Sequence, residues 1–169
     1  MVLERDVEGK AISRVVRTHF RWQGREGVHY NLHLNGFGTD KPWEDKRLDL
    51  FSPRFWWIYL QQYRDAYLRR ARESEKIRAL LDQEHLPLIV SGDLNSTPHN
   101  SAFYWLVDGM QDAFKVGGRG WGATYHVRLP VVRIDHVFVS PEWQIVSARV
   151  SEAPYSDHFP LVVRLRWRE

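Results

Sequence analysis

The sequence predicts an α+β fold, a layered α/β sandwich in which helices flank a mixed, mostly antiparallel sheet. The predicted elements follow the order strands, long helix, buried strand, short helix and further strands, which favours a layered fold over a bundle or a barrel. A length of 169 residues suggests a single domain, 1–169, and a hydrophobic content of 43% suffices for a real core.

Two strands joined by a turn are predicted near the N-terminus, after a charged leader at 1–10. Residues 12–22 are rich in β-branched and aromatic side chains, and 23–27 hold turn-forming residues. In 28–34, apolar and polar residues alternate with a period of two, which indicates a strand with one buried face. The glycines and the proline of 35–45 indicate a loop.

A long helix is predicted from Ser52 to about Glu84. Serine is a favoured N-cap, and Pro53 is tolerated at the first helical position. About thirty residues is long for one globular helix, so the pattern leaves room for a break between Tyr63 and Arg72.

The remainder of the chain predicts a second helix and more strands. The apolar run 86–90 is typical of a buried central strand. A short helix at 100–107 and a flexible loop at 117–122 should follow. Further strands are expected at 123–127, 131–140, 144–150 and 160–167.

Composition excludes several kinds of protein. The absence of cysteine excludes disulfides and thiolate metal sites. No apolar run approaches the ~18 residues of a membrane helix. A formal charge of +3 suits a phosphate-bearing partner but carries little weight. Basic residues cluster on the predicted long helix, where a solvated face is the simpler explanation and nucleic-acid binding the alternative: Arg64, Arg69, Arg70, Arg72, Lys76 and Arg78.

Asp93 and Asn95 lie two residues apart at the end of the predicted central strand. A carboxylate and a carboxamide oxygen suit a hard cation such as Mg²⁺, and the asparagine amide can also donate to a phosphoryl oxygen. Because glycine, aspartate and asparagine favour turns, an ordinary turn is the alternative interpretation.

The tripeptide at 156–158 places Asp157 and His158 just before the last predicted strand. A neutral imidazole can serve as a general base near neutral pH. Adjacent residues of an extended segment point to opposite faces, so another acid must orient His158. Asp135, inside an apolar run, is the candidate, because pairing with an imidazole would offset the cost of its burial. A bond from Asp135 to backbone or to Arg133 is the alternative.

Four short motifs occur along the chain, in the order Asn31-Leu32-His33-Leu34, Gly92-Asp93-Leu94-Asn95, Arg133-Ile134-Asp135-His136 and Ser156-Asp157-His158. They resemble the motifs of the endonuclease/exonuclease/phosphatase superfamily, whose domain has the DNase I-like fold. His33 lies in the first of them, on the polar side of its strand, where a plain surface histidine is the alternative. Thr124-Tyr125 also fits the resemblance, which spans about 12–166.

This resemblance implies a phosphoesterase that uses Mg²⁺ or Mn²⁺. His158 would activate water or stabilise the transferring phosphoryl group, and Asp135 would orient it. His33 and Asn95 would bind the substrate phosphate. The residues that the resemblance assigns to catalysis are His33, Asp93, Asn95, Asp135 and His158, and those it assigns to the metal are Asp93, Asn95, Asp157 and His158.

Two features depart from the family pattern. His136 stands where the family usually has tyrosine or another aromatic residue. The family's N-terminal half supplies a strand-borne asparagine and a metal-binding glutamate, and nothing before His33 resembles either. Glu4 and Glu8 lie in the charged leader. We therefore expect the N-terminal half of the family domain to be missing, which predicts self-association through an exposed sheet face.

The implied function is hydrolysis of a phosphodiester or phosphomonoester by in-line attack of water. The substrate stays undecided between nucleic acid and a small phosphoester or lipid headgroup, and activity of this chain alone stays open. A non-catalytic interaction domain with the same fold is the alternative. A histidine-rich metal protein using His19, His29 and His33 ranks last, because these residues lack the spacing of zinc sites. The chain should be soluble in itself, either cytoplasmic or tethered to a membrane through a missing N-terminal part.

Overall fold

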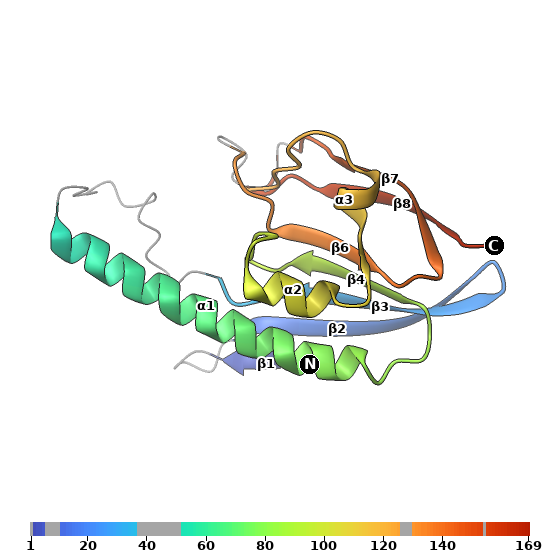
Figure 1. The fold of residues 1–169 in the computed structure, drawn as a ribbon, viewed down its shortest axis with the longest axis horizontal. Coiled ribbons are helices and arrows are strands. Elements are labelled where there is room, and N and C mark those ends of the chain that lie inside the picture. Colours follow the sequence, from blue (N-terminus) through green and yellow to red (C-terminus); the bar gives the residue numbers. More distant parts are fainter. Residues whose placement is uncertain (1, 6–10, 37–51, 126–129, 154) are drawn as a thin grey trace.

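The computed structural model describes residues 2–5, 11–36, 52–125, 130–153 and 155–169 (Figure 1). Strands and helices alternate in the predicted α+β order, which confirms the fold class. The elements are β1 Val2–Arg5, β2 Ala11–Trp22, β3 Arg25–His33, α1 Pro53–Leu81, β4 Leu88–Asp93, α2 Ser101–Val107, β5 Gln111–Asp112, α3 Ala113–Gly117, β6 Asp135–Val139, β7 Trp143–Val150 and β8 Leu161–Trp167.

Six strands form one mixed sheet in the order β1-β2-β3-β4-β6-β5, and β7 pairs with β8 in a second sheet. Within the described part of the chain, β3 and β4 are the parallel pair, and the other neighbours are antiparallel. A parallel pair needs a long crossover, which α1 supplies. The register of β3 and β4 sets His33 level with Asp93 at one edge of the sheet.

The core lies between the six-stranded sheet and the helices α1 and α2, which cover the same face (Figure 1). The alternation predicted for 28–34 is confirmed, because Val28, Tyr30, Leu32 and Leu34 are all buried. The opposite face of β3 and β4 carries polar residues, including the contact between His29 Nε2 and Ser91 Oγ at 2.8 Å.

Helix α1 begins as predicted, with the Ser52 hydroxyl accepting a hydrogen bond from the Phe55 amide at 3.3 Å. The helix is continuous, so the break considered near Tyr63 does not occur. The solvated basic face is only partly confirmed, because Arg70 is almost fully buried. No helix within the described ranges is both long and apolar enough to cross a membrane.

Some element boundaries differ from the predicted ones. Positive φ angles at Gln23 and Gly24 make a two-residue turn, so β3 starts earlier than expected. β4 continues through its motif to Asp93. Residues 2–5 of the predicted leader form β1. Residues 37–51, which include most of the predicted loop, lie outside the described residues.

Of the strand predicted at 123–127, the described residues 123–125 form no strand. Tyr125 forms only isolated bridges, to Val132 and to His158, and 126–129 lie outside the described residues. The strand predicted at 131–140 is shortened to β6. The short elements β5 and α3 were not predicted, because segments of two and five residues show no periodicity.

A cluster of tryptophans joins the β2–β3 hairpin to the second sheet. Trp143 is 1% exposed and stacks on Trp167 with 3.8 Å between ring centroids. Trp22 lies 6.1 Å from Trp143, and its carbonyl accepts a hydrogen bond from Trp167 Nε1 at 3.1 Å. Packing between the two sheets therefore accounts for part of the high tryptophan content.

Glu84 ties the segment after α1 to the hairpin, and its replacement should make stability less dependent on pH. Its carboxylate accepts hydrogen bonds from the Arg17 guanidinium and from the Tyr30 hydroxyl, the latter at 2.6 Å. The hydrogen bond from Arg17 lowers the pKa of Glu84. A lowered pKa in the folded state stabilises the protein above the unfolded value of about 4.3, and this stabilisation is lost as pH falls through the folded value.

We expect Glu84→Gln to lower the free energy of unfolding near neutral pH by about 1 kcal/mol, because Arg17 is half exposed and solvent screens the pair. The difference from the unsubstituted protein should shrink in acid. Urea unfolding near neutral pH and again below the unfolded pKa of about 4.3 tests this. Asp82→Asn is the control, because this carboxylate is 62% exposed in its pair with Arg78. Equal losses at both pH values would contradict the assignment.

Candidate active site

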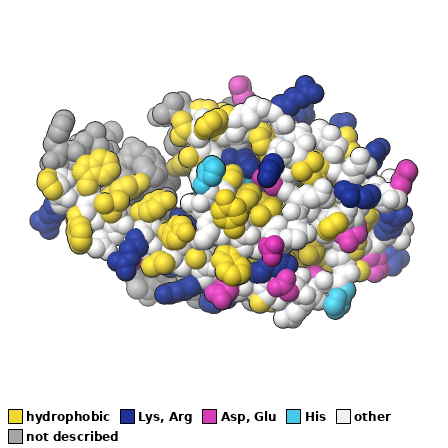
Figure 2. Space-filling view, in the orientation of Figure 1, with side chains coloured by type: hydrophobic (Ala, Val, Ile, Leu, Met, Phe, Trp, Pro, Cys, Tyr) yellow, Lys and Arg dark blue, Asp and Glu magenta, His cyan; other side chains and the backbone are white. Residues whose placement is uncertain are grey.

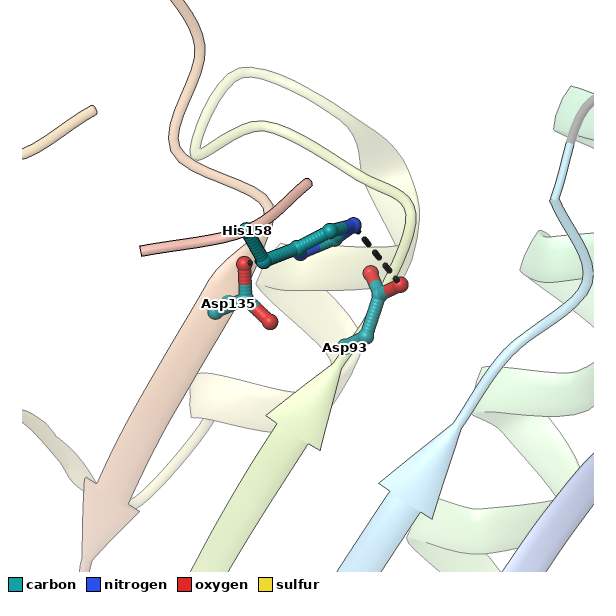
Figure 3. Close-up of side chains that lie close together, drawn as sticks. All are labelled: Asp93, Asp135 and His158. Atoms are coloured by element: carbon teal, nitrogen blue, oxygen red, sulfur yellow. Dashed lines mark hydrogen bonds and ion pairs between the residues drawn. The ribbon is translucent and has the colours of Figure 1, made fainter. Parts of the chain in front are cut away.

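Two carboxylates meet where β4 ends and β6 begins (Figure 3). Asp93 is the last residue of β4 and Asp135 the first of β6, and the antiparallel register places them directly opposite each other. Gly92 allows this arrangement, since its φ of +139° and its closeness to the Leu32 carbonyl leave no room for a side chain.

His158 lies between these carboxylates. Its Nδ1 contacts Asp135 Oδ2 at 2.8 Å, and its Nε2 faces Asp93 Oδ2 at 4.0 Å (Figure 3). The Tyr125 ring packs beside the imidazole, with 4.9 Å between centroids. The structure thus pairs Asp135 with His158, as predicted. The alternative partner of Asp135, Arg133, instead forms two hydrogen bonds with Asp112.

Thr124 connects the two segments that carry this pair. Its fully buried hydroxyl accepts hydrogen bonds from the backbone amides of Ile134 and Asp135, both at 3.2 Å. Its carbonyl accepts the Phe159 amide at 2.8 Å. Thr124 therefore fixes the backbone beside Asp135 and beside His158, a role that its place ahead of the strand does not reveal.

His33 lies on the other side of Asp93. Its Nε2 is 3.9 Å from Asp93 Oδ2, and its side chain is 55% exposed. Both histidines therefore approach the same carboxylate oxygen, one from β3 and one from the segment before β8. The structure brings together residues that are more than 120 positions apart in the sequence.

Asn95 adopts a left-handed backbone, with a φ of +46°, directly after β4. Its backbone N–H donates to Asp93 Oδ1 at 2.7 Å. Its side-chain Nδ2 donates to the Leu34 carbonyl at 3.0 Å and to Asp93 Oδ2 at 3.3 Å. The two bonds from Nδ2 occupy both hydrogens of the side-chain amide. The oxygen Oδ1 is therefore the atom better placed to take part in chemistry.

The surroundings shift the pKa values of both central groups. Burial raises the pKa of Asp93, and the nearby charge of Asp135 adds to this, while the Asn95 amide opposes it. The hydrogen bond with Asp135 raises the pKa of His158. A cation at this point would relieve the repulsion between the two carboxylates.

His136 supports the site from the core side, in the place where the family usually has an aromatic residue. It is 1% exposed, stacks on Phe138 and meets Phe103 edge-on, so it fills the place of an aromatic residue. Its Nε2 lies 2.8 Å from the Ser96 carbonyl, next to Asn95. Burial lowers the pKa of His136 to about 4, so the ring is neutral at physiological pH and Nε2 carries the proton.

Possible ligand atoms of Asp93, Asp135 and His158 lie within 4.8 Å of one another. Among the described residues, these three form the cluster of acidic and histidine side chains that could hold a metal ion. Carboxylate oxygens fit Mg²⁺ or Mn²⁺. Asp157 is exposed and lies outside the group, so its predicted metal role stays a prediction. The histidine-rich alternative gains no support, since that group among the described residues contains none of His19, His29 and His33.

The sequence model of the Endonuclease/Exonuclease/phosphatase family matches residues 58–158, a segment that contains Asp93, Asn95, Asp135 and His158. The chain belongs to this family. Membership confirms the resemblance drawn from the four motifs, and with it a phosphoester hydrolase ancestry. None of the curated proteins is similar enough in sequence to match this family member.

Solved structures share the family fold. A conserved protein of unknown function from Enterococcus faecalis V583 is 16% identical, with a TM-score of 0.67, over 91% of this chain and 56% of that one. The human Nocturnin catalytic domain with bound sulfate is 18% identical, with a TM-score of 0.60, over 97% and 56%. A mannosyl-6-phosphatase from Bacteroides thetaiotaomicron VPI-5482 is 22% identical, with a TM-score of 0.56, over 89% and 56%. The chain thus spans little more than half of each.

Proposed function

We propose that this family member hydrolyses a phosphate ester, either a phosphodiester or a phosphomonoester, by in-line attack of water with Mg²⁺ or Mn²⁺ bound. The observation that carries the proposal is the position of His158 between Asp135 and Asp93 (Figure 3). A histidine that is oriented by one carboxylate and faces a second one at a possible cation site matches the needs of phosphoryl transfer.

Asp135 fixes the imidazole in the tautomer that carries its proton on Nδ1, because that nitrogen donates to the carboxylate at 2.8 Å. Nε2 then presents a lone pair towards the space beside Asp93 and can accept a proton from the attacking water. His33, which is exposed on the far side of Asp93, can donate a hydrogen bond to a non-bridging phosphoryl oxygen.

Asp93, with the Asn95 Oδ1 atom two residues further on, would hold a divalent cation beside His158. The resemblance also implies Asp157 and His158 as ligands; we assign the lone pair of His158 Nε2 to the attacking water, because Nδ1 is already bonded to Asp135. A bound Mg²⁺ or Mn²⁺ would offset the charge that develops on the phosphoryl oxygens. Because the hydrogen bonds of Asn95 already occupy its amide hydrogens, we assign it to the cation before the substrate phosphate.

Hydrolysis of bis(p-nitrophenyl) phosphate tests the proposal. We expect turnover that requires Mg²⁺ or Mn²⁺, stops with EDTA and is abolished by Asp93→Asn. Asp82→Asn is the matched control, because Asp82 is an exposed carboxylate beside the C-terminus of α1. Turnover that persists in EDTA would contradict metal dependence. No turnover from protein with an intact circular dichroism spectrum would favour the alternative, an interaction domain that keeps the family fold.

A further inference from the structure

Helix α1 has two unlike halves. Its buried residues all lie from Ala66 onward, whereas no side chain from 53 to 65 is buried. Figure 1 shows this first half projecting beyond the sheet, past the edge where β3 and β4 end. At about 1.5 Å per residue, the projection is roughly 20 Å long. Core packing does not explain why its sequence is apolar.

Large apolar side chains line one side of the projecting half. Residues three or four apart share a helix face, so Trp57 and Leu60 lie together, with Trp56 beside them. Leu68, two steps of four beyond Leu60, continues this face just past the projecting half. We call these four residues the aromatic stripe. Their exposed fractions are 44% for Trp56, 65% for Trp57, 56% for Leu60 and 40% for Leu68. Figure 2 shows hydrophobic side chains along this end of the molecule, with basic side chains next to them.

The charge around the aromatic stripe is positive. Between 53 and 72, Asp65 is the sole acidic residue. The exposed cations there are Arg54, Arg64, Arg69 and Arg72. Arg64 lies within the stripe itself, four residues from both Leu60 and Leu68. Exposed tryptophans with arginines among them are the composition of a helix that lies in the headgroup layer of an anionic bilayer.

A second copy of the chain is a poorer occupant of this surface. A helix–helix seam requires apolar residues at alternating spacings of three and four. Starting from Trp57 and Leu60, the next seam position is Arg64. Pairing two copies along this seam would bury this arginine, and the nearest acidic residue of the same face, Glu75, lies eleven positions or about three turns away.

We propose that the aromatic stripe docks on the surface of membranes that contain anionic phospholipid. The Leu68 end of the stripe lies close to the candidate active site, because the next turn of α1 contacts the residue Asn35. Arg70 Nη1 donates to the Asn35 carbonyl at 3.2 Å, and Glu73 Oε2 accepts the Asn35 amide at 3.0 Å, two residues after His33. Docking would therefore turn the site edge towards the bilayer and favour a phospholipid headgroup as substrate. This last consequence rests on the proposed function, whereas the docking itself does not.

Co-sedimentation with vesicles tests the docking in the presence of EDTA, so the result is independent of hydrolysis. Vesicles of phosphatidylcholine alone are compared with vesicles that also contain phosphatidylglycerol. We expect binding to the anionic vesicles, weakened by salt and reduced roughly tenfold or more by the double substitution Trp57→Ala/Leu60→Ala. Arg64→Glu should weaken binding to the vesicles that contain phosphatidylglycerol and leave any binding to phosphatidylcholine vesicles unchanged.

The control is Tyr104→Ala/Trp105→Ala, which removes two side chains that are 60% and 49% exposed on α2. It should leave vesicle binding unchanged. The proposal is overturned if the unsubstituted protein fails to bind anionic vesicles, or if the control reduces binding as much as the stripe variant. Self-association in sedimentation velocity that the stripe variant abolishes would overturn it in favour of a second copy.

Discussion

Replacing Gly92 with alanine is expected to lower the free energy of unfolding by more than about 3 kcal/mol. The added Cβ would lie 1.9 Å from the Leu32 carbonyl oxygen, in a backbone with a φ of +139°. Relief requires β3 and β4 to separate, which disrupts the ladder on both sides of Asp93. Urea unfolding measures the loss of stability.

Gly109→Ala separates the steric effect from the cost of a positive φ. Gly109 has a φ of +70°, but no atom lies within 4 Å of the position of an added Cβ. Its replacement should therefore cost only about 1–2 kcal/mol. Similar losses for both variants would mean that the close approach of β3 and β4 contributes little.

Replacing His158 with alanine is expected to reduce metal-dependent hydrolysis by about 10²–10⁴-fold, the usual contribution of a general acid or base. The substitution removes the group that Asp135 orients and that faces Asp93. The side chain is only 24% exposed, but it lies at the edge of the sheet and outside the core, so the fold should survive. Steady-state kinetics with the same phosphodiester measure the loss.

His85→Ala is the matched control, because His85 is exposed beyond the C-terminus of α1, and its turnover should equal that of the unsubstituted protein. Asp135→Asn should reduce turnover by a comparable factor, since the amide can donate to Nδ1 and hold the ring in the tautomer that carries its proton on Nε2. A His158→Ala variant with full turnover would remove His158 from the reaction and, with it, the proposed mechanism.

The candidate site could be predicted from sequence because its acids and imidazoles stand at the ends of apolar runs. The resemblance assigned Asp93 and His33 to one site, and the parallel register of β3 and β4 sets them side by side. The pairing of Asp135 with His158 followed from the cost of burying a lone carboxylate.

What could not be predicted depends on contacts between distant segments. The role of Thr124 requires a backbone bond to Phe159 that no local pattern encodes. The burial of Arg70 on a run of basic residues depends on the Asn35 carbonyl that it meets. The strand expected at 123–127 had the right composition, but Tyr125 finds only single bridging partners in the fold.

The stacked indoles of Trp143 and Trp167 should give this protein a spectroscopic marker of its packing. Two such rings 3.8 Å apart couple their electronic transitions, which should produce a paired positive and negative band in circular dichroism. One ring belongs to β7 and the other to β8, and the hairpin that carries Trp22 closes over both. Loss of this signal would report separation of β7 from β8 even while the helices stay intact.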